Sequence, residues 1–129
     1  MSATHSELVR EFCMALSTGD MRLARRYLAD DVHYHNQPWA PMTGADAACE
    51  FLQPFVDGTH CRLAKMNILH QAAEGDVVMN AREELWVRGT LEVVLPVAGL
   101  FVVADEAIVR WVDYWDLATF KPMLDAIAA

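Results

Sequence analysis

The chain has 129 residues, of which 54% are hydrophobic, so it is long and apolar enough to enclose one sizeable core, and we expect a single domain over residues 1–129. Its formal net charge is −8. Nucleic acids and anionic membranes are bound by clustered Lys and Arg, so this charge argues against both as partners and favours a neutral or positively charged small ligand.

Neither the cysteines nor the apolar segments point to secretion or to a membrane. Cys13, Cys49 and Cys61 are odd in number and lack metal-ligand spacing, and the N-terminus lacks the basic and apolar pattern of a signal peptide. The most apolar run, Val93–Ala104, is interrupted by Pro96 and is shorter than the roughly 20 residues that cross a bilayer. We therefore expect a cytoplasmic protein with free thiols.

The N-terminal part of the chain predicts two helices. Thr4 and Glu7 have the spacing of a capping box, and apolar residues follow at helical intervals towards Gly19, at Leu8, Phe12 and Leu16. Asp20 is expected to cap a second, short helix that Asp30-Asp31 breaks. The residues that this helix is expected to turn inward are Leu23, Tyr27 and Leu28.

The rest of the chain predicts one more helix, then strands. Val32–Asn36 predicts a short strand, a loop containing prolines follows, and residues 44–56 predict a helix. From Cys61 onward the pattern predicts four strands separated by polar turns, at 61–72, 77–87, 91–104 and 107–116. A last helix is capped by Asp116. This order indicates an α+β fold, in which a curved sheet is wrapped by three to four helices around an apolar pocket.

The last predicted strand carries the most informative pattern. Side chains alternate between the two faces of a strand, so Trp111, Asp113 and Trp115 share one face. A carboxyl group between two indoles loses solvation, and this raises its pKa towards the range in which it acts as a base near neutral pH. Asp113 is therefore a candidate general base, and the competing interpretation is a structural carboxylate paired with an arginine.

A second polar group lies on the strand at 77–87. Asn80, Arg82, Glu84 and Trp86 share one face of this strand. If that face also holds Asp113, Arg82 would bridge two carboxyl groups and keep one ionised and one protonated, as a one-step general acid and base mechanism requires. The competing interpretation is a surface ion pair, which contributes little to stability.

On the first predicted strand, Tyr34 and Asn36 share a face and offer a hydroxyl and an amide that would fix a water molecule. A core tyrosine and a turn-capping amide are the alternative. His33 and His35 share the opposite face, but no acid follows at metal-site spacing, so we expect packing or surface histidines and no metal.

Three segments, Tyr34-His35-Asn36-Gln37-Pro38, Arg82-Glu83-Glu84 and Trp111–Leu117, together resemble the limonene-1,2-epoxide hydrolase family, within the nuclear-transport-factor-2-like and SnoaL-like superfamily. The resemblance implies a cone-shaped α+β domain, usually a homodimer. It also implies addition of water to an epoxide without a metal, another cofactor or a covalent intermediate.

By this resemblance each candidate residue has a role. Asp113 matches the family's base, Tyr34 and Asn36 match the groups that hold the nucleophilic water, and Arg82 matches the arginine that links the two acids. Glu84 matches the proton donor, where the family usually has Asp. The extra methylene moves this acid by roughly 1 Å, enough to affect the rate if nothing compensates.

Pocket residues are the least specific part of the prediction. Trp111 matches a pocket residue of the family, and Trp115 stands where the family is expected to have Phe, which would narrow the pocket. The remaining residues expected at the pocket are Leu16, Cys13, Trp86 and Phe120, with ordinary core packing as the competing interpretation.

The sequence thus predicts an epoxide hydrolase that converts a small or medium apolar epoxide to a vicinal diol. Two alternatives stay open. The same acids would serve a SnoaL-like cyclase or isomerase, or the chain is a non-enzymatic small-molecule-binding dimer. The apolar run Val93–Phe101 would supply a dimer interface in any of these cases.

Overall fold

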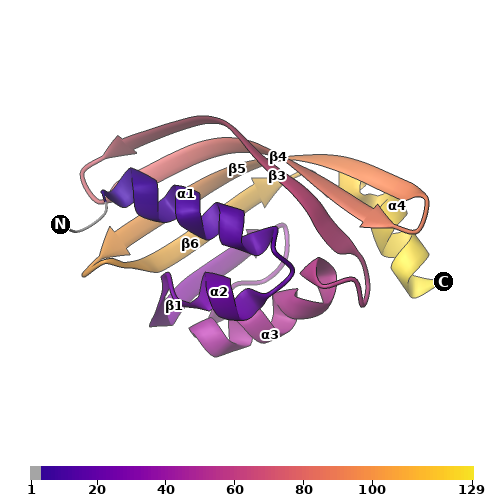
Figure 1. Ribbon diagram of the computed structural model, residues 1–129, viewed down its shortest axis with the longest axis horizontal. Helices are drawn as coiled ribbons and strands as arrows, with labels where there is room; N and C mark the ends of the chain where they lie inside the picture. Colours follow the sequence, from indigo (N-terminus) through magenta and orange to yellow (C-terminus); the bar gives the residue numbers. More distant parts are fainter. Residues whose placement is uncertain (1–3) are drawn as a thin grey trace.

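The computed structural model describes residues 4–129, which form a six-stranded sheet and four helices (Figure 1). The helices are α1 (His5–Leu16), α2 (Met21–Arg25), α3 (Ala45–Val56) and α4 (Leu117–Ala128). The strands are β1 (Leu28–Gln37), β2 (Met42–Thr43), β3 (Arg62–Glu74), β4 (Val77–Arg88), β5 (Leu91–Ala104) and β6 (Ala107–Trp115). The expected α+β fold is therefore confirmed.

The sheet is mixed. Its strand order is β2-β1-β6-β5-β4-β3, and every neighbouring pair is antiparallel except β1 and β6, which run parallel. Since β1 comes from the first third of the chain and β6 from the last, this parallel pair brings Tyr34 beside Trp111 and Asn36 beside Asp113. The topology thus places two distant candidate segments side by side.

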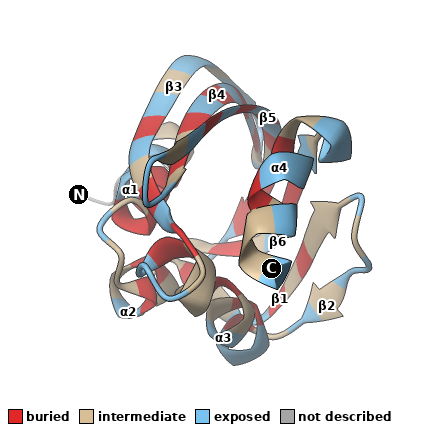
Figure 2. Ribbon diagram, turned by 90° about the vertical axis from the view of Figure 1, so that its right-hand side faces the viewer, coloured by how far each residue is buried: buried red, intermediate tan, exposed pale blue. Residues whose placement is uncertain are grey.

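The helices complete a ring with the curved sheet (Figure 2). Helix α1 packs against β3 and β4, α2 lies against α1 and α3, α3 contacts β1, β2 and β3, and α4 contacts β5. Along β4 the buried positions alternate strictly with more exposed ones, so one face of the strand points to the interior. No helix within residues 4–129 has the length and apolarity needed to span a membrane.

The first helix begins as its sequence predicts. The Thr4 hydroxyl accepts a hydrogen bond from the Glu7 amide at 3.1 Å, and the Glu7 carboxylate accepts one from the Thr4 amide at 3.4 Å. These reciprocal bonds form the capping box and satisfy amides that have no partner within the helix.

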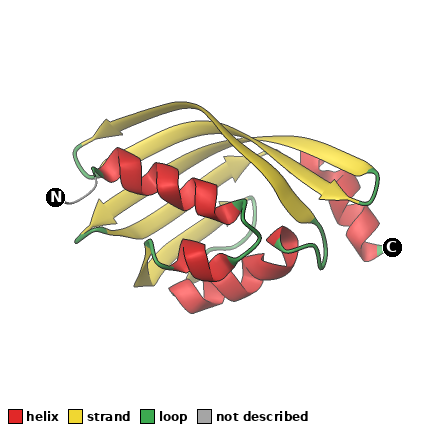
Figure 3. Cartoon of the chain, viewed as in Figure 1, coloured by secondary structure: helices red, strands yellow, loops and turns green. Residues whose placement is uncertain are grey.

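The prediction for the second helix was wrong at its C-terminal end. Helix α2 stops at Arg25, and Leu28 already belongs to β1, so Asp30 and Asp31 lie within a strand and do not break a helix (Figure 3). The cause is pairing with a strand from the other end of the chain. The Ile108 amide donates to the Tyr27 carbonyl at 2.8 Å, and the segment pairs with β6 as a parallel strand. The short strand β2, in the loop after β1, was also missed.

Candidate active site

Four amide or charged side chains are buried in the described chain, and three of them lie on one strand. Asn80, Arg82 and Glu84 point inward from β4, and Asp113 points inward from β6. Strand β5 lies between β4 and β6, so any contact between Arg82 and Asp113 has to cross it.

A glycine lies at this crossing point. Gly99 of β5 is the ladder neighbour of Asn80 on one side and of Asp113 on the other. A Cβ atom at this position would overlap Arg82 Nη1 and would lie 2.9 Å from Asn80 Oδ1. Because protein interiors leave no room for such overlap, only glycine lets the guanidinium pass from β4 to β6.

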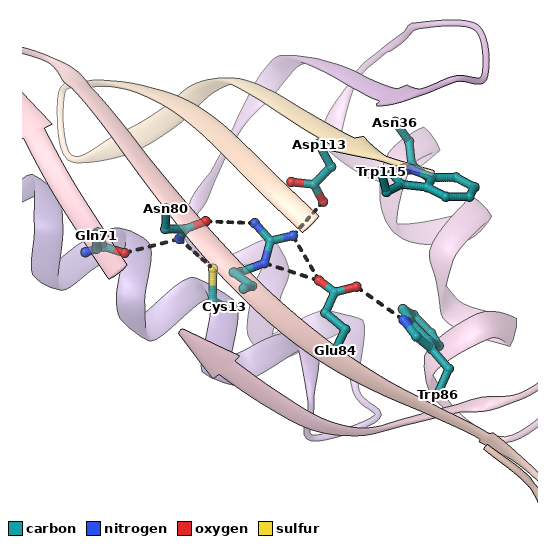
Figure 4. Close-up of polar contacts among 9 residues, drawn as sticks. Cys13, Asn36, Gln71, Asn80, Glu84, Trp86, Asp113 and Trp115 are labelled. Atoms are coloured by element: carbon teal, nitrogen blue, oxygen red, sulfur yellow. Dashed lines mark hydrogen bonds and ion pairs between the residues drawn. The ribbon is translucent and has the colours of Figure 1, made fainter. Parts of the chain in front are cut away.

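The Arg82 guanidinium is the centre of the buried hydrogen-bond network that Figure 4 shows. Its Nη2 donates to Asp113 Oδ2 and to Glu84 Oε2, both at 2.9 Å, and its Nε donates to the same Glu84 oxygen at 3.2 Å. Its Nη1 donates to Asn80 Oδ1 at 3.0 Å. The arginine thus joins the two acids directly and has no solvent-exposed side-chain surface.

The Asn80 side chain has two contacts besides its bond to Arg82. Its Nδ2 donates to Gln71 Oε1 at 3.2 Å and lies 3.7 Å from Cys13 Sγ. Cys13 was expected to line the pocket, but it does not, because its thiol lies beside Asn80, at the opposite end of the network from Glu84 (Figure 4). Burial raises the pKa of this thiol to about 11, so it stays protonated at neutral pH.

Burial sets the charge balance of the site. It raises the pKa of Glu84 against the opposing effect of Arg82, and the charge of Asp113 raises it further. Burial opposes the charge of Arg82, but the two acids outweigh it and raise the arginine pKa well above its ordinary value. Arg82 is therefore a permanent cation beside a carboxyl group, Glu84, whose ionisation is opposed by burial.

The two acids differ in their partners. Both oxygens of Glu84 accept hydrogen bonds, from Arg82 and, at 3.2 Å, from Trp86 Nε1. Asp113 accepts only from Arg82, and its Oδ1 is buried without a partner among residues 4–129. Since Asp113 also lines the cavity, this oxygen is the one that can accept a hydrogen bond from a bound molecule.

Tyr34 and Asn36 reach the same cavity from β1. The Tyr34 ring stacks on Trp111 with centroids 4.1 Å apart, and burial raises the pKa of its hydroxyl well above the ordinary value. Asn36 Oδ1 accepts a hydrogen bond from Trp115 Nε1 at 2.7 Å. An indole N–H only donates, so this bond fixes which end of the amide is the oxygen.

These groups open onto one cavity of about 60 Å³, whose wall is mainly aromatic and aliphatic. Five of the six residues expected at the pocket line it, namely Leu16, Trp86, Trp111, Trp115 and Phe120. The polar members of the wall are Tyr34, Asn36, Glu84 and Asp113. The structure therefore brings the acid pair and the water-binding candidates to one apolar chamber.

Several wall residues were missed from the sequence. Trp39 lies in the loop after β1, and Phe51 lies on α3, four residues before Phe55, which the sequence left open between pocket and core. The helical spacing of the two phenylalanines was a usable signal, because residues i and i+4 share a face. Gly99 gave no signal, since its role depends on the position of Arg82 on the neighbouring strand β4.

The chain matches the limonene-1,2-epoxide hydrolase catalytic domain over residues 3–127. The chain belongs to this family. An LEH-like epoxide hydrolase from M. tuberculosis is 27% identical, with a TM-score of 0.80, and the alignment covers 97% of this chain and 92% of that one. No curated protein matches the chain.

Other solved structures share the fold at lower identity. A candidate SnoaL-like polyketide cyclase from Jannaschia sp. CCS1 is 16% identical, with a TM-score of 0.77, over 97% of this chain and 92% of that one. A candidate polyketide cyclase from Pseudomonas putida KT2440 is 21% identical, with a TM-score of 0.73, over 95% and 98% of the two chains. At these identities the likeness shows the SnoaL-like fold and no more.

Replacing Arg82 with Met is expected to lower the free energy of unfolding at pH 7 by about 3–5 kcal/mol, because it leaves two buried carboxyl groups without a cation. Without the arginine, which opposes the effect of burial, the pKa of Glu84 in the folded variant would lie further above its unfolded value. Such a group stabilises the folded state at low pH, and this stability is lost as the pH rises through the folded pKa. Urea unfolding should therefore show a smaller deficit at pH 4.5 than at pH 7. Arg10→Met, on an exposed position of α1, is the control, and an equal deficit at both pH values would contradict the prediction.

Gly99→Ala is expected to lower the free energy of unfolding by about 1–3 kcal/mol, the usual effect of overpacking a core. Much of the clash is with Arg82, so the same substitution should be less destabilising in the Arg82→Met background. Denaturant unfolding of the two single variants and the double variant measures this coupling. If the losses in free energy of unfolding of the two single variants simply add in the double variant, Gly99 is not needed to make room for the Arg82 guanidinium.

Proposed function

We propose that this protein is an epoxide hydrolase that adds water to a small or medium apolar epoxide and releases a vicinal diol. The observation that carries the proposal is the pair of buried acids on Arg82, both of which line an apolar cavity, while one Asp113 oxygen has no partner among residues 4–129. Family membership and the LEH-like epoxide hydrolase from M. tuberculosis support the same reaction.

Asp113 is the proposed base. A water molecule at Asp113 Oδ1 donates one hydrogen to that oxygen and the other to Asn36 Oδ1, which keeps a lone pair beside its bond to Trp115. Tyr34 stays protonated and donates its hydroxyl hydrogen to the water. This arrangement leaves one lone pair of the water oxygen to attack the epoxide.

Glu84 is the proposed acid. As the water oxygen bonds to one epoxide carbon, the bond from that carbon to the ring oxygen breaks, and the ring oxygen takes the proton of Glu84. Asp113 takes the proton of the water, so the reaction ends with Asp113 protonated and Glu84 ionised. Arg82 contacts both acids and stabilises the single negative charge at either end. Loss of the Asp113 proton to solvent and protonation of Glu84 then restore the starting state.

The cavity favours an apolar substrate. Aromatic rings from the loop after β1, α3, β4, β6 and α4 make up much of its wall, and its polar groups are confined to those assigned above. Such a wall binds a hydrocarbon skeleton through area burial and leaves the epoxide oxygen as the natural partner for the acid. Terpene, cycloalkene and styrene-type oxides are suitable substrates for a first screen.

Asp113→Asn is expected to reduce diol formation by about 10²–10⁴-fold, because an amide cannot accept the proton of the water. With the wild-type protein in ¹⁸O water, mass spectrometry should find a single labelled hydroxyl in the diol. Asp31→Asn, an exposed carboxylate of β1, is the control. Normal turnover by a folded Asp113→Asn variant would remove the mechanism. A cyclic ether or an isomer as product would instead favour the cyclase and isomerase alternatives.

We also propose that two copies of the chain pair through the outer face of the sheet. Exposed apolar side chains gather there on the central strands, with Met79 of β4 exposed by 53%, Val94 of β5 by 52% and Tyr114 of β6 by 44%. Ala98 lies between β4 and β6 in the ladder, as the neighbour of Ala81 and of Tyr114. Exposed apolar side chains on one face of a sheet are typical of an interface.

Ala98→Glu is expected to halve the mass measured by sedimentation, because it places a carboxylate in the middle of this face. The substitution lies on the opposite side of the sheet from the cavity, so the fold, followed by circular dichroism, should be retained. A wild-type protein that sediments as a monomer at micromolar concentration would overturn the proposed pairing.

A further inference from the structure

Glu84 has a partner that the proposed mechanism does not use. Trp86 lies two residues along β4 on the same face, and its Nε1 donates to Glu84 Oε1 at 3.2 Å. The other carboxylate oxygen, Oε2, already accepts hydrogen bonds from Nε and Nη2 of Arg82. Oε1 is therefore the oxygen left to carry and deliver the proton.

An indole N–H cannot accept a hydrogen bond. The ionised carboxylate accepts the N–H of Trp86 as a charge-assisted bond, whereas a protonated Oε1 accepts it only as a weaker neutral bond. On this geometry, and resting on the proposed function, we propose that Trp86 is a positioning residue that stabilises the ionised form of Glu84 and thereby makes it a stronger acid towards the epoxide oxygen.

The indole is packed in place for this task. Its ring meets Phe120 of α4 edge to face with centroids 5.6 Å apart, and Phe120 in turn meets Trp115 at 5.7 Å. The position of the carboxyl matters too, because an aspartate, the usual residue of the family here, is one methylene shorter. The Glu84 side chain is long enough to contact Arg82 with one oxygen and Trp86 with the other.

Among the groups around Glu84, Trp86 is the uncharged hydrogen-bond donor. The charged or titratable side chains close enough to interact electrostatically with Glu84 are Arg82 of the same strand, Asp113 of β6, Tyr34 of β1 and Cys13 of α1. Burial keeps the tyrosine and the thiol protonated, and Arg82 stays charged. The parts of β3, β5, α3 and α4 that line the cavity with Glu84 are apolar.

The first experiment needs no substrate and uses the unmodified protein. Proton–nitrogen NMR resolves the indole N–H groups of the four tryptophans. As the pH rises through the Glu84 pKa, the Trp86 resonance should move downfield with the carboxyl titration, because its bond to the carboxylate then becomes charge-assisted. The Trp39 resonance should move little. A Trp86 resonance that ignores the titration would overturn the proposal.

The second experiment compares Trp86→Phe with Trp39→Phe, the same substitution elsewhere in the cavity wall. Trp86→Phe removes a donor to the ionised form, so ¹³C NMR of labelled glutamate should find the pKa of Glu84 about one pH unit higher. Trp39→Phe should leave it in place. An unchanged or lower pKa in folded Trp86→Phe would refute the role of the indole.

Kinetics then separate this inference from the proposed function. In Trp86→Phe the alkaline limb of the rate profile should move to higher pH by the same interval, while the rate on the plateau falls because Glu84 is a weaker acid. A mutation that only loosened the pocket would lower the rate without moving the limb. If the NMR titration moves but no epoxide is hydrolysed, the proposed function fails and the Trp86 contact stands.

Discussion

The structure depends on the Arg82 guanidinium, which is fully buried on the inner face of the sheet. A charge in such a place is unfavourable unless it is paired and hydrogen-bonded, and Arg82 meets this requirement with Asn80, Glu84 and Asp113. The pairing joins β4 to β6 across β5 and explains the glycine at position 99 of that strand. One electrostatic requirement thus determines residues on three neighbouring strands.

The same arrangement makes two similar acids unequal. Glu84 is surrounded by donors on both oxygens, whereas Asp113 keeps one oxygen without a partner among the described residues. In an apolar chamber an unpaired acceptor is costly, so it attracts a hydrogen-bond donor such as water. Under the proposed mechanism, the free oxygen of Asp113 is what suits this acid to bind the water molecule.

Much of this site follows from strand alternation in the sequence. The period of two predicts that Arg82, Glu84 and Trp86 share a face, and that Trp111, Asp113 and Trp115 do so, and it is reliable because β4 is buried at every second position. Alternation does not say which strands are neighbours in the sheet. The parallel pairing of β1 with β6, which also caused the error at the end of α2, depends on residues 80 positions apart, such as Leu28 and Ile108.

Cys13 shows that a residue's type can mislead about its place, and Trp115, which lines the cavity as expected, shows that a correctly placed residue can have a further contact. Both belong to the helix or strand that was expected. The Cys13 thiol, however, contacts Asn80, and the Trp115 indole donates a hydrogen bond to Asn36 as well as packing in the cavity wall. Trp115 orients the Asn36 amide just as Trp86 contacts Glu84, so two indole donors fix the polar groups on either side of Asp113. Because these donors belong to packed aromatic rings, the cavity wall itself holds the polar groups in place, and the proposed reaction needs such positioning because its water molecule must be held for attack.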